Sequence, residues 1–235
     1  MGVIADLPLG APIPDWQPPP HPPRDAVQGR YVRLEPIDID RHARSLFDAF
    51  AGDDVGWAYL SYGPFETFAD FVAWMRATCL DADPQFHALC DAEGRALGVA
   101  SYLRIQSAAG SIEIGHLHFS PALQRTPATT EALSLLIARA FSLGYRRVEW
   151  KCNALNAASM AAARRLGLSY EGTFRQAMVS KGRNRDTAWF AIIDREWPAI
   201  AAAHARWLAT DNFDAAGRQR QALSKLTAPL LHIPD

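Results

Sequence analysis

Cysteine and lysine are scarce in this sequence, and neither sign of charge predominates. The three cysteines, Cys79, Cys90 and Cys152, are an odd number, and no C-x-x-C spacing occurs. This usage disfavours both a disulfide framework and a thiolate zinc site. We therefore expect small buried thiols in a reducing compartment.

The charges and the hydropathy pattern disfavour several classes of protein. The 235 residues carry 24 Lys+Arg against 25 Asp+Glu, and the formal net charge is −1. No charge excess favours nucleic acid or a membrane surface as a partner. No window approaches the roughly 18 apolar residues of a membrane span, and the first ten residues lack the basic and apolar segments of a secretory signal. We expect a cytoplasmic protein.

Proline is concentrated at the start of the chain, where eight of the 16 prolines fall within the first 23 residues. Each proline removes a backbone donor and fixes φ, so residues 1–26 are predicted to form neither helix nor sheet. This proline-rich arm is expected either to be disordered or to lie as an extended strap over the folded body, anchored by Trp16. A role as a polyproline ligand is equally open.

Hydrophobic periodicity divides the rest of the chain into strands and helices. Alternating residues predict strands near 31–36, 85–92, 96–105, 111–120, 146–155, 168–179 and 187–197. Helical stripes predict helices over 42–52, 67–80, 127–145 and 156–167, with further helix after Trp197. This order predicts an α+β or mixed-sheet fold in which a helix crosses between the fourth and fifth strands.

A helix start at Thr126 and Pro127 offers an anion-binding site. Thr126 suits the N-cap, Pro127 suits the first helical position, and Glu131 falls in or near the first turn. The unpaired N–H groups and the dipole at such a helix start attract phosphate. A well-capped helix without any ligand explains the same residues.

A second element, the predicted helix 156–167, carries more information. Asn156 and Ser159 fall in its first turn, and Gly167 ends it. The segment aligns with the pattern N-x-x-A-x-x-L-Y-x-K-x-G-F position by position and without a gap. The aligned positions hold Asn156, Ser159 in place of alanine, Ala162, Ala163, Arg165, Gly167 and Leu168. Here the chain resembles the GNAT superfamily of acetyl-CoA-dependent N-acetyltransferases. The segments YEGTFRQ and IEIGHLHFSP are similar to its ribosomal-protein (Rim-type) branch.

The resemblance implies a GNAT fold over residues 27–197. That fold is a mixed, mostly antiparallel sheet of about seven strands, flanked by helices and splayed in the middle for acyl-CoA. The proline-rich arm, residues 1–26, and a helical C-terminal tail, residues 198–235, lie outside it.

The resemblance also assigns residues to acetyl-CoA, the implied cosubstrate, and implies no metal. The backbone of Leu117, His118 and Phe119, at a strand end, is expected to bind the pantetheine. The family's pyrophosphate loop, [QR]-x-x-G-x-[GA], falls on Gln124, Arg125, Thr126, Pro127, Ala128 and Thr129, and the expected set is completed by Asn156, Ser159 and Arg164.

The loop departs from the family pattern at Pro127, which replaces a glycine, and at Thr129. Proline removes one N–H that could bind a phosphate oxygen, while it pre-sets a helical φ. One interpretation is that the remaining amides, Arg125 and the hydroxyls of Thr126 and Thr129 hold the cofactor. The other is that the loop is degenerate and binds weakly.

For catalysis, the resemblance implies direct attack of an amine on the acetyl thioester, which needs a base and a donor for the leaving thiolate. Glu113 is the expected base, acting through water, although a solvent-facing strand glutamate explains it as well. The position of the family's tyrosine acid is Ala163 here. Ser159 is therefore the expected donor, ahead of Tyr170 and Cys152.

Other residues near the expected thioester have less specific roles. Asn156 is expected to orient the pantetheine or the thioester. His116 and His118 share a strand face, but no third ligand lies nearby in sequence, so we expect no metal there. The turn 181–186, KGRNRD, would repel polycations and admit acidic groups. Four aromatic residues could stack on the acceptor or pack in the core: Trp57, Tyr59, Tyr62 and Phe65.

We therefore predict an acetyl-CoA-dependent N-acetyltransferase that acetylates a primary amine, either a protein N-terminus or a small molecule. The alternative, favoured by Pro127 and Ala163, is a catalytically impaired acyl-CoA-binding or protein-interaction module of the same fold. A nucleotide-phosphate enzyme is disfavoured because neither G-x-x-x-x-G-K-[ST] nor G-x-G-x-x-G occurs. Four apolar tail residues could cover the domain or a second subunit in a homodimer: Trp207, Leu208, Phe213 and Leu223.

Overall fold

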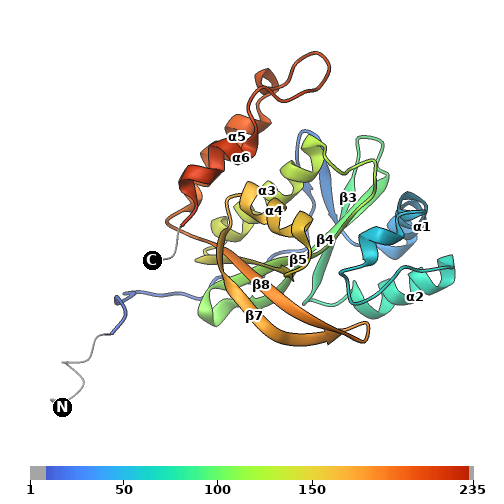
Figure 1. Ribbon diagram of the computed structural model, residues 1–235, viewed down its shortest axis with the longest axis horizontal. Coiled ribbons are helices and arrows are strands. Elements are labelled where there is room, and N and C mark those ends of the chain that lie inside the picture. The colour runs from blue at the N-terminus through green and yellow to red at the C-terminus, as the bar shows by residue number, and fades with distance from the viewer. Residues whose placement is uncertain (1–8, 233–235) are drawn as a thin grey trace.

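The computed structural model describes residues 9–232, which fold around one eight-stranded sheet (Figure 1). Neighbouring strands follow the order β1-β2-β3-β4-β5-β6-β8-β7. The strands are β1 (Val27–Gln28), β2 (Arg33–Pro36), β3 (Gln85–Cys90), β4 (Ala96–Gln106), β5 (Ser111–Phe119), β6 (Arg147–Asn153), β7 (Ser169–Ser180) and β8 (Arg183–Ile193). The predicted α+β architecture is confirmed, and the strand beyond the expected seven is the two-residue β1.

Six α-helices accompany the sheet within the described residues. They are α1 (Ile39–Phe50), α2 (Phe68–Thr78), α3 (Pro127–Ser142), α4 (Ala157–Arg165), α5 (Trp197–Leu208) and α6 (Leu223–Thr227). Three helix starts are fixed by side-chain caps, in which Asp38, Thr67 and Asn156 accept hydrogen bonds from first-turn N–H groups. Because Asp38 is the cap, α1 begins three residues before the predicted residue 42.

The sheet opens in its middle, between β5 and β6. These strands are parallel and pair over three positions, the last being Glu113 with Glu149. Beyond that pair, β5 runs on to Phe119 and β6 to Asn153 without pairing to each other, although β5 stays paired with β4 and β6 with β8. The two strands therefore diverge. A bulge at His116, whose φ is +51°, bends β5 in the same region. The expected splay is thereby confirmed, and α3 is the expected crossover helix.

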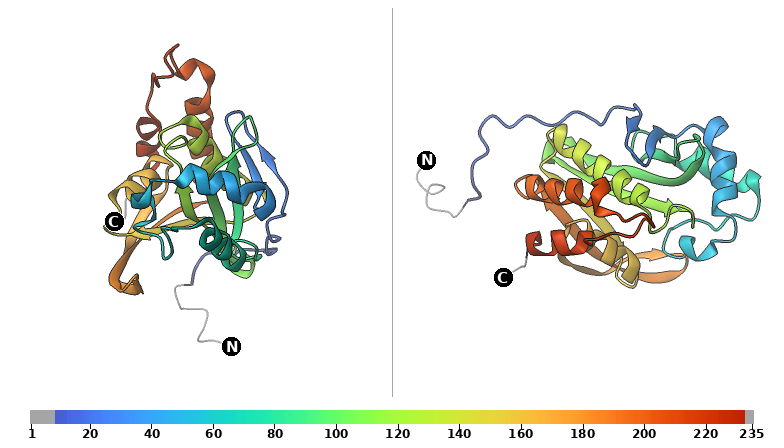
Figure 2. Two further views of the ribbon diagram at one scale, coloured as in Figure 1. Left: turned by 90° about the vertical axis from the view of Figure 1, so that its right-hand side faces the viewer. Right: turned by 90° about the horizontal axis from the view of Figure 1, so that it is seen from above.

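The helices cover both faces of the sheet. Along β3, Phe86, Ala88 and Cys90 join a core cluster with α1 and α2, whereas Leu89 joins the cluster under α3, α4 and α5. Successive side chains of a strand point to opposite faces, so the two clusters lie on opposite sides of β3. Figure 2 shows α5 lying beside α3, on the side of the sheet away from α1 and α2.

Residues 16–26 of the proline-rich arm lie against the domain, whereas residues 9–15 are exposed. Pro19 and Pro22 are buried. The Trp16 indole donates a hydrogen bond of 3.3 Å to the Ala108 carbonyl, and the Tyr145 hydroxyl donates one of 3.2 Å to the Pro20 carbonyl. Residues 16–26 therefore form an extended strap anchored by Trp16, while residues 1–8 lie outside the described residues.

The C-terminal tail folds back on its own domain. Trp207 and Leu223 are buried in the core under α3 and α4. His204 on α5 is hydrogen-bonded to Ser134 on α3 and donates through Nε2 to the Leu166 carbonyl after α4. Trp207 and Leu223 therefore cover this domain, and neither side chain is exposed to a second subunit.

Among the described residues, no helix has the length and apolar character needed to cross a membrane.

Candidate active site

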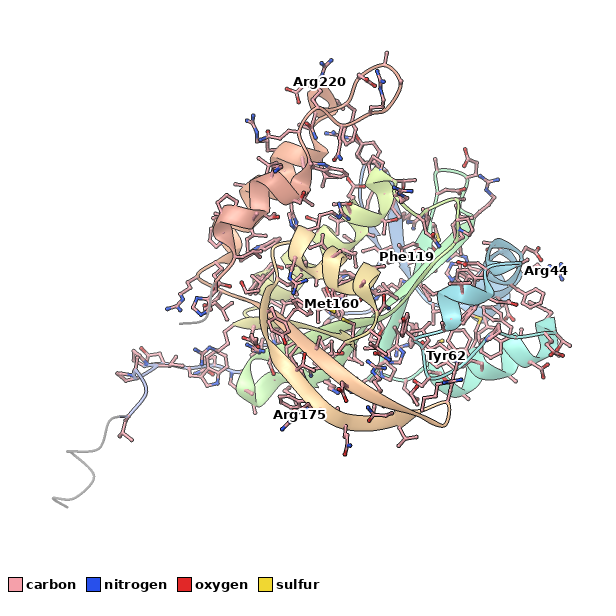
Figure 3. The ribbon with its side chains drawn as sticks, in the orientation of Figure 1. Arg44, Tyr62, Phe119, Met160, Arg175 and Arg220 are labelled. Carbon is pink, nitrogen blue, oxygen red and sulfur yellow. The ribbon has the colours of Figure 1, made fainter. Side chains whose placement is uncertain are left out.

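Two adjoining clefts open where β5 and β6 diverge. The larger, about 830 Å³, lies among the end of β5, the start of α3, and α4. The smaller, about 180 Å³, lies beside Glu113 on β5. Figure 3 labels Phe119 at the end of β5 and Met160 on α4, the elements on either side of the larger cleft. Six residues line both clefts and define their junction: Gly56, Tyr59, Leu117, Trp150, Asn156 and Ser159.

The start of α3 forms one end of the larger cleft. Pro127 is the first helical residue and Thr126 the N-cap, as predicted, but no side chain caps the helix. The N–H groups of Ala128 and Thr129 therefore keep no acceptor within the helix. Such amides, with the positive end of the helix dipole, suit an anion.

The two threonine hydroxyls of this loop are already engaged. Both Thr126 Oγ1 and Thr129 Oγ1 donate hydrogen bonds to the Leu123 carbonyl, at 2.7 Å and 2.6 Å. Their protons hold the loop in shape, so neither is free to donate to a phosphate. Arg125, by contrast, is exposed and adopts a φ of +63° at the cleft.

Most residues expected to bind the cofactor line the larger cleft. They are Leu117, His118, Phe119, Gln124, Arg125, Thr126, Pro127, Thr129, Asn156 and Ser159. Ala128 does not line it, although its backbone N–H lies in the first turn of α3. Gln124 is fixed by donating hydrogen bonds to Asp53 and to the Phe119 carbonyl.

Arg164, also expected to bind the cofactor, lies outside the larger cleft. Its guanidinium lies over the rings of Tyr170 and Phe190, and it does not line the larger cleft. The next residue, Arg165, lines the cleft and donates a hydrogen bond of 3.0 Å to Thr130 on α3. Consecutive helical residues point about 100° apart, so the resemblance identified the right turn of α4 but not the arginine that faces the cleft.

The C-terminal tail supplies one wall of the larger cleft, which sequence reasoning missed. The wall consists of Trp207, Phe213, Gly217, Gln219, Ala222, Leu223 and Ser224. The Trp207 indole donates a hydrogen bond of 2.7 Å to Gln219, and its ring meets that of Phe213 edge-on. The aromatic residues of the tail indicated that it packs on a surface. Nothing local in the sequence indicated that this surface borders the larger cleft.

Comparison with known proteins assigns the family. The acetyltransferase (GNAT) domain model matches residues 32–169. The chain belongs to the GNAT acetyltransferase family. No curated protein matches the sequence.

Solved structures of other GNAT proteins agree with this assignment. A GCN5-related N-acetyltransferase from Brucella melitensis is 43% identical, with a TM-score of 0.90 over 92% of this chain and 100% of that one. A probable GNAT acetyltransferase from Chromobacterium violaceum is 47% identical, with a TM-score of 0.78 over 82% of this chain and 98% of that one. The microcin C7 self-immunity acetyltransferase MccE, in complex with acetyl-CoA and AMP, is 19% identical and shares the fold, with a TM-score of 0.64 over 74% and 98%.

In this GNAT chain, Ser159 lies at the junction of the two clefts. The Trp150 indole donates to Ser159 Oγ at 3.0 Å, and the Asn156 side chain accepts from the Ser159 backbone N–H at 3.0 Å. The hydroxyl oxygen therefore acts as an acceptor toward Trp150, while its own O–H faces the Cys152 thiol, whose pKa is raised by burial and lowered in part by this hydrogen bond from Ser159. Asn156 is held as the cap of α4.

Glu113 lies in the smaller cleft, within an ion-pair network. Its Oε2 accepts from Arg104 at 2.6 Å and pairs with Lys151 Nζ at 2.9 Å. The carboxylate is buried, so it is not the solvent-facing strand glutamate that was the alternative. No hydrogen bond between described residues uses its Oε1, which is the atom left for a substrate or a water.

The two strand histidines are neutral packing residues near neutral pH. Burial lowers the pKa of His116 and of His118 to about 4 in each case. The His118 ring stacks on Trp57, and His116 Nδ1 is hydrogen-bonded to the Tyr62 hydroxyl at 2.7 Å. Trp57, Tyr62 and Phe65 thus belong to the aromatic core, whereas the partly exposed Tyr59 lines both clefts.

The two other candidate proton donors differ in position. Cys152 lines the smaller cleft, where burial raises the pKa of its thiol. The Tyr170 hydroxyl is hydrogen-bonded to Thr173 at 2.8 Å, and Tyr170 lines neither cleft. Of the expected donors, only Ser159 lies where the clefts join.

Proposed function

We propose that this GNAT acetyltransferase uses acetyl-CoA and transfers the acetyl group directly to a primary amine. The observation that carries the proposal is the junction of the two clefts at Ser159, in the gap between β5 and β6. An elongated thioester in the larger cleft would meet an amine from the smaller one at this point. Holding both reactants in one geometry is itself a large part of catalysis.

The larger cleft fits coenzyme A in its donor set. The amides at the start of α3, with Arg125 and Arg165, form a cationic end for the pyrophosphate. The strand edge at Leu117 to Phe119 would bind the pantetheine arm, because β5 has no partner on its β6 side there. Pro127 removes one amide, and the neighbouring Arg165 and the tail wall compensate for it.

The chemistry would divide between two residues. The amine nitrogen attacks the thioester carbonyl as the carbon–sulfur bond breaks, and Glu113 Oε1 takes the amine proton through a water. Ser159 donates a hydrogen bond to the departing thiolate sulfur, which takes up a proton. Asn156 keeps α4, and with it Ser159, in place.

The chain would be organised around this site as a catalytic domain, residues 27–197, with the arm 1–26 and the tail 198–235. We propose a cytoplasmic location, which the free thiols of Cys79, Cys90 and Cys152 support. The acceptor is a primary amine of a small molecule or of a protein N-terminus.

Calorimetric titration of acetyl-CoA, followed by measurement of thiol release with a panel of amines, tests the proposal. We expect binding at one site and acetyl transfer to at least one amine. Failure to bind acetyl-CoA would contradict the proposal. Binding without transfer to any amine would instead support the alternative, a catalytically impaired acyl-CoA-binding module.

A further inference from the structure

The smaller cleft is lined by more cations than anions. Arg104, Lys151 and Arg185 line it, against the single carboxylate of Glu113. A cleft with unbalanced charge favours a ligand of the opposite sign. The net charge of the cleft depends on which of these cations form ion pairs with carboxylates outside its lining.

Two of the three cations belong to a balanced network. Arg104 and Lys151 both pair with Glu113, and Lys151 also pairs with Glu149 at 2.7 Å. Arg147 pairs with Glu149 at 2.8 Å and extends the network with a hydrogen bond of 2.7 Å to Glu171. Three basic residues thus face three carboxylates, so this network contributes no excess charge.

Arg185 is the cation that remains. Its Nε is buried without a hydrogen-bond partner, and no ion pair within residues 9–232 includes its guanidinium. The adjacent Asp186 forms no ion pair with Arg185 among the described residues, and its Oδ1 accepts from the Gln176 N–H and from the Asn184 side chain. Burial lowers the pKa of Arg185 from its ordinary value, but a guanidinium stays protonated at neutral pH.

Arg185 is half-buried, and its buried Nε–H costs free energy unless a ligand supplies the acceptor. Its planar donor set matches the paired oxygens of a carboxylate or a phosphate. The smaller cleft, at about 180 Å³, suits a compact group beside Glu113. A compact amine with an oxyanion group fits these conditions.

Building on the proposed function, we propose that the acceptor is a small amine carrying an oxyanion group, which Arg185 binds while the amine faces Glu113. Free amino acids are the simplest members of this class. Arg185 is then a specificity-determining residue, since a neutral or cationic amine would leave its charge unpaired.

The test compares amines that differ only in the oxyanion group. One arm pairs amino acids with the corresponding amino-acid amides, and the other pairs O-phosphoethanolamine with ethanolamine. In at least one arm we expect the anionic member to have a kcat/KM at least about tenfold higher, the range of a charge-assisted hydrogen bond. The responding arm identifies the oxyanion as carboxylate or phosphate.

Two variants assign the preference to Arg185. Arg185→Gln should abolish the preference by raising KM for the anionic amine, and Arg185→Lys should restore part of it. Arg183→Gln is the matched control, because Arg183 is exposed on the same strand and lines neither cleft. The acetyl-CoA affinity should be the same in all four proteins.

Equal rates for anionic and neutral amines, or equal losses for both in Arg185→Gln, would overturn the proposal. So would the absence of both turnover and calorimetric binding for every anionic amine in the acetyl-CoA-loaded protein. Because acetyl-CoA binding is measured separately, these results would leave the proposed function standing. Loss of acetyl-CoA binding in the wild type would contradict the proposed function itself.

Discussion

The indole Nε1 of Trp150 on β6 donates a hydrogen bond of 3.0 Å to the hydroxyl of Ser159 on α4. Both residues line both clefts, and the bond holds the Ser159 hydroxyl at the junction of the two clefts.

Ser159→Ala should lower kcat by about ten- to a hundredfold, the value of a hydrogen bond to a charged group. The dissociation constant of acetyl-CoA should change little. Steady-state thiol release and calorimetry measure the two quantities. Ser134→Ala is the control, because that hydroxyl bonds to His204 away from both clefts and its loss should affect stability alone. An unchanged kcat in Ser159→Ala would remove Ser159 from the mechanism.

Glu113→Gln should depress turnover by about a hundredfold or more, because the amide cannot accept the amine proton. Acetyl-CoA affinity should be little changed, since Glu113 lines only the smaller cleft. Glu149→Gln disturbs the same network through Lys151 but lines neither cleft, so it should retain most of the activity. Similar losses in both variants would indicate that the network matters only for structure.

Phe213→Ala should raise KM for acetyl-CoA several-fold and leave kcat nearly unchanged, because the ring forms part of the cofactor wall. The expected loss is about 1–2 kcal/mol of binding free energy, the contribution of a partly buried aromatic surface. Leu226→Ala provides the comparison, as this tail residue packs on the core but does not line the cleft. Equal KM values in both variants would mean that the tail wall does not touch the cofactor.

Four histidines, three buried and one half-buried, should make the fold acid-sensitive. Burial lowers the pKa of His87, His116, His118 and His204 to about 4 each. Since the unfolded chain binds these protons near pH 6.5, stability is full above that pH and is lost as the pH falls toward 4. Each histidine contributes a slope of up to about 1.4 kcal/mol per pH unit.

Urea unfolding at pH 7 and pH 5 checks this prediction. The variant His87→Leu should reduce the difference between the two free energies of unfolding, because His87 is buried with both ring nitrogens unpartnered. His21 lies exposed on the arm, so His21→Leu is its control. A difference that His87→Leu leaves unaltered would mean that this histidine does not carry the acid sensitivity.

Local features of the site were predictable from the sequence because they depend on neighbours in the chain. Asn156 caps α4 through the Ser159 N–H three residues on, and Gly167, whose φ is +90°, follows the same helix. Pro127 takes the first position of α3. Alternation and helical stripes likewise predicted the order of the strands and helices, whereas the opening of the sheet between β5 and β6 was implied by the family resemblance.

The partners of those residues depend on spatial neighbours that the sequence alone does not reveal. Glu131, expected near the first turn of α3, accepts from the N–H groups of Arg30, Tyr31 and Val32, about a hundred positions away. Arg165 replaces Arg164 at the cleft because only the packing of α4 sets its rotation.

The sequence by itself determined the family, the order of the elements and the residues at the helix starts, because propensity, capping and periodicity act over a few positions. The tertiary structure alone decided the charge of the smaller cleft. Arg104, Glu113, Lys151 and Arg185 come from four different strands, and only the register and order of the sheet bring them together. The unpaired Arg185 follows from that assembly, since the other cations find carboxylates on neighbouring strands and it does not.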